Sequence, residues 1–123
     1  MRKVLITGGT GFVGANFVYK FLELNDEVHL LVRPESNFWR IAPVKESVKL
    51  HVVDITKKKD VEKFISNLKP EIILHFAAYG AYQRKEQDVK TTVDTNFLGT
   101  VNLVNACSAV PFSCFLNTGS NSE

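Results

Sequence analysis

Apolar residues alternate along the chain between short continuous runs and stretches with helical spacing. The continuous runs are KVLITG, EVHLLV, VKLHVVD, EIILHFAA and PFSCFLN, at residues 3–8, 27–32, 48–54, 71–78 and 111–117. Short apolar runs rich in β-branched residues and closed by glycine, proline or polar residues are typical of strands buried on both faces of a sheet. The pattern therefore predicts five strands.

Between these runs, apolar residues recur every three to four positions, as in an amphipathic helix. This spacing predicts helices over residues 12–24, about 57–68 and about 91–109. Residues 35–47 are mixed and predict at most a short packed helix or loop, and the polar residues 80–90 predict a loop that leads into the third helix. Strands that alternate with helices specify a parallel sheet with right-handed crossovers. We therefore expect an α/β fold with a doubly wound parallel sheet of the Rossmann type.

Composition and charge narrow the class of protein. A chain of 123 residues, 45% of them hydrophobic, is long enough for one core and too short for two ordinary domains. We therefore expect residues 1–123 to form a single domain or part of one. Its 15 basic and 13 acidic residues are spread along the chain, which favours neither nucleic acid nor a membrane surface as a partner. No run approaches the roughly 20 apolar residues of a membrane helix, and we see no secretory signal pattern. Cys107 and Cys114 indicate buried free thiols in a reducing cytoplasm.

A glycine-rich segment, TGGTGFVG, follows the first predicted strand and opens the first predicted helix. Read from Gly9 it is G-x-G-x-x-G, and read from Gly8 it is G-x-x-G-x-x-G. Glycine permits the tight turn and the close approach of backbone to a pyrophosphate, and the helix N-terminus supplies partial positive charge. The segment predicts a dinucleotide site that includes Gly8, Gly9, Thr10, Gly11, Phe12, Val13 and Gly14.

The end of the second predicted strand bears on which dinucleotide is bound. An acidic residue there normally holds a free ribose 2′-hydroxyl, whereas arginine accommodates a 2′-phosphate. Here the strand ends in Val32-Arg33-Pro34. Arg33 favours NADP over NAD, although it is also interpretable as an ordinary exposed arginine, and Glu35 nearby keeps both cofactors open.

Polar residues at other predicted strand ends are candidates for a functional role and for a structural one. Asp54, followed by Ile55, ends the third predicted strand, where an adenine would lie, and Asp54 equally suits a turn or helix cap. The basic run at residues 57–59 has no interleaved aromatic residues and indicates a solvated face. The histidines lack the spacing of metal ligands, so we expect no metal site. His75, nearest the expected cofactor, is interpreted as a hydrogen-bonded structural histidine.

Four segments, TGGTGFVG, HFAAYG, NFLGTVNLVNAC and FLNTGSNSE, resemble in order and spacing the extended short-chain dehydrogenase/reductase family. More narrowly, they look like the nucleotide-sugar epimerases, dehydratases and 4-ketoreductases, and the likeness covers essentially the whole chain. The resemblance implies an NAD(P)-dependent oxidoreductase that moves hydride between the nicotinamide and C4 of a nucleotide-linked hexose. It also implies a homodimer that packs through the helix predicted at 91–109 and the helix that follows it in the family.

The resemblance assigns roles to individual residues. Gly8, Gly11 and Gly14 would be the pyrophosphate glycines, and Asp54 would face the adenine. The cofactor wall after the fourth predicted strand would consist of Ala77, Ala78 and Tyr79.

On the catalytic side, Ser120 would hydrogen-bond the reacting oxygen of the sugar, with Thr118 as the less favoured alternative. Asn96 would support the active site, and a buried structural role is its alternative.

One part of the family pattern is missing. The family's Tyr-x-x-x-Lys proton-transfer pair follows the serine, yet none of Tyr19, Tyr79 and Tyr82 has a lysine four residues on. We therefore expect the N-terminal, cofactor-binding portion of such an enzyme, without its C-terminal substrate domain. This portion should be inactive or nearly so, because a positioned acid contributes roughly 10²- to 10⁴-fold.

Whether the chain is an enzyme as it stands remains open at this point. A non-catalytic NADPH-binding sensor or regulatory module is the alternative, and an isoflavone- or flavonol-type reductase would keep the chemistry and change the substrate.

Overall fold

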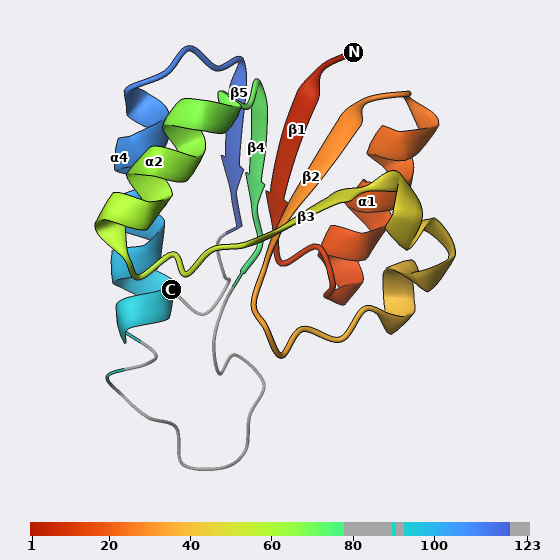
Figure 1. Cartoon of the computed structure of the whole chain (residues 1–123), viewed down its shortest axis with the longest axis horizontal. Helices are drawn as coiled ribbons and strands as arrows, with labels where there is room; N and C mark the ends of the chain where they lie inside the picture. Colours follow the sequence, from red (N-terminus) through yellow and green to blue (C-terminus); the bar gives the residue numbers. More distant parts are fainter. Residues whose placement is uncertain (78–89, 91–92, 119–123) are drawn as a thin grey trace. The chain divides into compact units, whose positions relative to one another are not determined.

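The computed structural model describes residues 1–77, 90 and 93–118. They include a five-stranded parallel sheet with the order β3-β2-β1-β4-β5 (Figure 1). This arrangement confirms the predicted α/β fold of the Rossmann type. The strands are β1 (Lys3–Thr7), β2 (Glu27–Val32), β3 (Lys49–Val52), β4 (Ile72–His75) and β5 (Cys114–Asn117).

The helical elements agree with the predicted periodicity, with local differences. They are α1 (Phe12–Glu23), the 3₁₀-helical η1 (Trp39–Ser47), α2 (Lys58–Leu68), the π-helical turn η2 (Asp94–Leu98) and α4 (Gly99–Ser108). The helix predicted over 91–109 is thus interrupted by a π turn, and residues 91 and 92 lie outside the described residues. Strands β3, β4 and β5 are shorter than the predicted runs at 48–54, 71–78 and 111–117.

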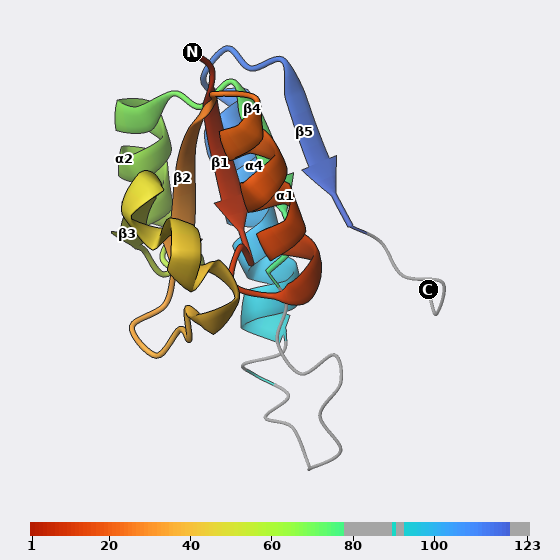
Figure 2. The same ribbon diagram turned by 90° about the vertical axis from the view of Figure 1, so that its right-hand side faces the viewer.

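The described residues form two compact units. The sheet unit contains the five strands, α1 and η1, and draws its described residues from 1–52, 70–76 and 112–118. In it, α1 packs against β1 and β2, as Figure 2 shows. The helical unit contains α2, η2 and α4, within residues 53–69 and 77–111.

The core of the sheet unit explains why β1 is apolar without interruption. Residues Val4 to Thr7 are all buried, so both faces of this central strand are covered. Burying each large aliphatic side chain stabilises the fold by roughly 1.5–3 kcal/mol. The main buried cluster consists of Val4, Ile6, Ala15, Val18, Val28, Leu30, Val32, Ile41, Val48 and Leu74.

The turn between α1 and β2 is fixed by local backbone conformation and one ion pair. Asn25 adopts a left-handed conformation with φ 62°, which asparagine tolerates better than most residues. The buried Asp26 then accepts two hydrogen bonds from the Arg2 guanidinium, at 3.0 and 2.7 Å. The hydrogen bonds from Arg2 also lower the pKa of Asp26. The starts of β1 and β2 are thereby joined.

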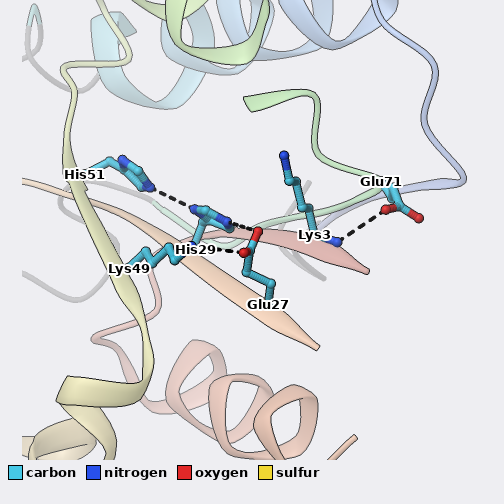
Figure 3. A network of polar contacts seen from close by, with 6 residues as sticks. All are labelled: Lys3, Glu27, His29, Lys49, His51 and Glu71. Carbon is cyan, nitrogen blue, oxygen red and sulfur yellow. Dashed lines mark hydrogen bonds and ion pairs between the residues drawn. The ribbon is translucent and has the colours of Figure 1, made fainter. Parts of the chain in front are cut away.

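A polar network joins β2 to β3 (Figure 3). His29 Nε2 lies 2.8 Å from Glu27 Oε2, and His29 Nδ1 lies 2.9 Å from His51 Nε2. Lys49 Nζ donates to Glu27 Oε1 at 2.9 Å. Hydrogen bonds from His29 and Lys49 lower the pKa of Glu27 to about 2. His29 and His51 thus link β2 to β3.

In the helical unit, α2 and α4 pack against each other. Asn102 Nδ2 donates to the carbonyl oxygen of Ile55 at 2.9 Å, which ties α4 to the segment before α2. A Cβ at Gly99 would lie 2.6 Å from Ile55 Cδ1, so glycine there permits the close approach. Helix α2 ends where Lys69 turns left-handed with φ 52°, immediately before Pro70.

The two cysteines differ in environment. Cys107 is buried, as predicted, and burial raises the pKa of its thiol to about 11. The prediction for Cys114 was wrong, because it lies on β5 at the edge of the sheet and is exposed. In the described part of the chain, no helix is long and apolar enough to cross a membrane.

Candidate dinucleotide-binding site

The strand order locates the expected site. The chain runs outward from β1 through β2 to β3 and then returns to the other side of β1 with β4. In open α/β sheets, ligands bind beyond the carboxyl ends of the strands where the order reverses in this way. The reversal here lies between β1, which leads into the glycine turn at residues 8–11, and β4.

The glycine turn is tightly built. Gly8 has φ 72°, a left-handed conformation that side chains disfavour. A Cβ at Gly14 would lie only 2.1 Å from the carbonyl oxygen of Gly8, so the first turn of α1 packs directly on the turn backbone. At Gly9 the added atom would meet the Leu30 side chain at 2.7 Å. The turn, α1 and β2 are therefore packed as closely as the motif predicts.

The start of α1 fits an anionic group. Gly11 is its N-cap and makes no side-chain cap hydrogen bond, and the first turn carries no acidic residue. The first N–H groups of a helix have no intrahelical acceptor, and the helix dipole adds partial positive charge. A Cβ at Gly11 would meet nothing nearer than the Gly8 carbonyl oxygen at 3.4 Å. These features suit a pyrophosphate approached by backbone N–H groups.

A buried pair joins the carboxyl ends of β1 and β4. Thr7 and His75 are register partners, and His75 Nδ1 lies 2.6 Å from Thr7 Oγ1. Thr7 Oγ1 also accepts the Phe76 N–H at 3.1 Å. Burial lowers the pKa of His75. The structural interpretation of His75 is confirmed, whereas the role of Thr7 was missed because only the strand register places it beside His75.

Arg33 follows β2 directly, in an exposed turn. Its backbone N–H donates to Ser36 Oγ at 3.0 Å, and its Nε lies 3.7 Å from Glu35 Oε1. Arg33 therefore lies next to the end of β2, and its guanidinium makes one long ion-pair contact, with Glu35. Its assignment to a 2′-phosphate stays a prediction.

The candidate residues in the helical unit differ in exposure and in their contacts. Asp54 is exposed, and its Oδ1 accepts the N–H and hydroxyl of Thr56 at 2.9 and 2.7 Å, which confirms the turn-forming role. Ile55 is buried beside Gly99. The side chain of Asn96 in η2 is exposed, so the alternative of a buried structural role was wrong. Ala77 is the last described residue after β4.

The remaining catalytic and cofactor candidates lie at the edges of the described residues. Thr118 follows β5, and its backbone N–H donates to the carbonyl oxygen of His75 at 3.4 Å. The sheet unit thus brings Thr118 to the end of β4. Ser120, Ala78 and Tyr79 lie outside the described residues.

The sequence matches the NAD dependent epimerase/dehydratase family over residues 4–123. The chain belongs to this family. The matched residues include the glycine turn, β1, β4 and the segment after β5.

Individual proteins are similar to most of the chain. The UDP-glucose 4-epimerase of Mycoplasma pneumoniae is 28% identical over 85% of the chain, and the 3-beta-hydroxysteroid dehydrogenase of Mycolicibacterium neoaurum is 35% identical over 99%. The solved UDP-glucose 4-epimerase of Thermus thermophilus in complex with NAD is 30% identical over 87% of the chain, with a TM-score of 0.73. The chain spans only 31%, 33% and 34% of these proteins, respectively.

Within the described residues, no group of three or more histidine, cysteine, aspartate or glutamate side chains is arranged to hold a metal ion.

Proposed function

We propose that this chain is the cofactor-binding portion of an NAD(P)-dependent oxidoreductase that acts on a nucleotide-linked sugar. The observation that carries the proposal is the glycine turn, in which Gly14 packs on Gly8. The start of α1 has no side-chain cap hydrogen bond and no acidic residue in its first turn. Membership of the epimerase/dehydratase family supports it, as do the UDP-glucose 4-epimerases among the similar proteins.

The residues of the sheet unit would bind and orient the cofactor. Backbone N–H groups from Phe12 onward would hold the pyrophosphate, and the Thr7–His75 pair would fix the two strand ends beneath it. When bound, the nicotinamide supplies a hydride donor or acceptor for the sugar C4. These contacts involve parts of the cofactor that NAD and NADP have in common, so they would serve either cofactor.

The sugar would be held by residues after β5. The Ser120 hydroxyl, with Thr118 as the alternative, would donate a hydrogen bond to the reacting oxygen as charge develops there. The supporting role of Asn96 stays an expectation from the family resemblance. Epimerisation, dehydration and reduction at C4 all require such a donor and a separate proton-transfer group. A Tyr-x-x-x-Lys encoded downstream of Glu123 in the same reading frame would support an enzyme, and a stop codon there would favour a sensor or regulatory module.

The cofactor assignment is tested by titration. We expect the purified chain to bind NADPH more tightly than NADH, because Arg33 directly follows β2, where an arginine would accommodate a 2′-phosphate. Arg33→Ala should narrow the NADPH-to-NADH affinity ratio, measured by isothermal titration calorimetry. Lys20 is an exposed cation on α1. Lys20→Ala is therefore the matched control, and it should leave the NADPH-to-NADH affinity ratio unchanged.

Equal affinity of the unmodified chain for the two cofactors would contradict the preference for NADP. Failure to bind either cofactor would contradict the proposed function itself.

A different substrate class has a specific observation in its favour. The steroid dehydrogenase relative has the highest identity of the three proteins compared above, at 35%. Saturation-transfer NMR with the NADP-loaded chain distinguishes the two classes: contacts from UDP-glucose support the sugar assignment, and contacts from a 3β-hydroxysteroid alone contradict it.

We further propose a cytoplasmic homodimer. The support is the exposed apolar residues of η2 and α4 and the exposed edge strand β5, which offer surface for a second copy.

A further inference from the structure

Two histidines connect β2 to the outermost strand β3, and Figure 3 shows them side by side. The rings of His29 on β2 and His51 on β3 stack with their centres 5.1 Å apart, and His29 Nδ1 lies 2.9 Å from His51 Nε2. On the other side of its ring, His29 Nε2 lies 2.8 Å from Glu27 Oε2. His29 is buried and His51 is half-buried, so the contact between them is largely shielded from water.

The hydrogen bonds of this histidine pair limit how many protons it can carry. The pKa of Glu27 of about 2 keeps its carboxylate ionised near neutral pH, and an ionised carboxylate only accepts, so His29 Nε2 is a donor. The contact between the rings needs one proton, carried by His29 Nδ1 or by His51 Nε2. Relative to two neutral rings, a first extra proton preserves this contact. A second extra proton places N–H groups on both facing nitrogens, and the hydrogen bond is lost.

The surrounding charges also oppose a second extra proton. Glu27 is the carboxylate beside the pair, and Lys49 Nζ on β3 already donates to its other oxygen at 2.9 Å. On β1, the register partner of Glu27 is Lys3, which is a further cation. Burial, together with the charges of His29 and Lys49, lowers the pKa of His51. Two imidazolium ions would therefore repel each other where the neighbouring carboxylate is already shared with a lysine.

The element that this repulsion would displace is β3. It has four residues, lies at the edge of the sheet and pairs with β2 alone among the described strands. Its side chains are exposed or half-buried, so little apolar burial holds it in place. Short segments with little buried apolar surface open most readily, so β3 is sensitive to the loss of a side-chain contact with β2.

We propose that the histidine pair is an acid-sensitive link in the fold, which holds β3 against β2 while it carries at most one extra proton and releases β3 when it takes up a second. This inference goes beyond the proposed function, because it involves no cofactor or substrate.

The direction of the pH dependence follows from His51. Its pKa in the folded chain lies below the ordinary value of 6.5, so the stabilising effect is complete above about pH 6.5. It declines as the pH falls from 6.5 toward the folded-state pKa. The acid range of Glu27, between its ordinary pKa of 4.5 and its folded-state pKa of about 2, is separate.

NMR measures protonation and strand opening on the same sample. Nitrogen chemical shifts of the rings report which ring atoms carry protons, and amide hydrogen exchange, corrected for the intrinsic effect of pH, reports the opening of β3. We expect His51 to titrate below pH 6.5. From pH 6.5 down to that midpoint, protection of the β3 amides should fall by up to about tenfold per pH unit, as for uptake of one proton on opening. The amides of α1, a helix without histidine, are the internal reference and should keep their protection.

Two variants separate the effect of the proton from the effect of the contact. His51→Gln keeps an N–H donor for His29 Nδ1 and does not titrate, so β3 should stay protected at neutral pH and lose its acid response. Lys49→Gln keeps both rings and removes a cation that lowers the pKa of His51. His51 should then titrate at higher pH, and the total loss of β3 protection should be smaller. Thermal unfolding of each variant establishes that it is folded.

Several outcomes would overturn the inference. Protection of the β3 amides that falls no more than that of the α1 amides would do so, as would a wild-type acid response in His51→Gln. A His51 that titrates at pH 6.5 or above would also do so, because the folded chain would then accept the proton without cost. If His51→Gln leaves β3 unprotected at neutral pH, Lys49→Gln decides, and an unchanged acid response in that variant overturns the inference. None of these measurements includes a cofactor, so they leave the proposed function to its own test.

Discussion

At the scale of single residues, the glycines of the turn have separable roles. Gly14 packs against the backbone of Gly8, since a Cβ added at Gly14 would lie 2.1 Å from the Gly8 carbonyl oxygen. A Cβ added at Gly11 would lie 3.4 Å from the same oxygen. Gly14→Ala should therefore lower the free energy of unfolding by about 3 kcal/mol or more, as severe overpacking does. Gly11→Ala should stay within about 1 kcal/mol of wild type and weaken dinucleotide binding instead.

Urea denaturation and cofactor titration of the two variants test this separation. A stable Gly14→Ala chain would show that α1 is able to move away from the turn. Unimpaired binding by Gly11→Ala would show that Gly11 does not face the pyrophosphate.

At the scale of secondary-structure elements, the contact between β2 and β3 makes an acid-sensitive contribution to stability. The pKa of Glu27 is about 2 in the folded chain, lowered by hydrogen bonds from His29 and Lys49 from an ordinary value of 4.5. Because the folded pKa lies below the unfolded one, the contribution is present above pH 4.5 and is lost as the pH falls toward 2. Glu27→Gln should lower the free energy of unfolding at pH 7 by about 1–2 kcal/mol. It should also reduce the loss of stability between pH 4.5 and 2, because glutamine does not titrate.

Urea denaturation between pH 7 and 2 measures both effects. Glu35→Gln is the control, because its exposed contact with Arg33 at 3.7 Å should contribute little. Parallel pH dependences of wild type and Glu27→Gln would contradict the role of this network.

The sequence predicted the elements better than the contacts between them. The turn from β1 into α1 was identified because its glycines, apolar strand and helical spacing are adjacent in the chain. The Thr7–His75 pair and the Arg40–Thr10 hydrogen bond join residues 68 and 30 positions apart, so they depend on strand register and on the path of η1. The exposure of Cys114 likewise follows from strand order, which periodicity does not contain.

At the scale of the whole molecule, the apolar face of η2 and α4 bears on self-association. Phe97, Val101 and Val104 recur at helical spacing with Val93, which immediately precedes η2, and all four are exposed, Phe97 by 63%. We expect the chain to sediment as a dimer and Phe97→Glu to sediment as a monomer, because a buried unpaired carboxylate is costly. Leu24→Glu, at an exposed apolar position after α1, is the control and should remain dimeric. A wild-type chain that stays monomeric at high concentration would contradict the dimer.

The central position of β1 also has a consequence for biosynthesis. β1 precedes both of its partners in the chain, and it pairs with residues 27–31 on one side and 72–75 on the other. A nascent chain therefore carries an apolar strand with one open edge until β4 has left the ribosome. Such edges promote aggregation during synthesis. Changes that slow the docking of β4, such as loss of the His75 contact with Thr7, should thus reduce the yield of folded chain in cells more than they reduce its equilibrium stability.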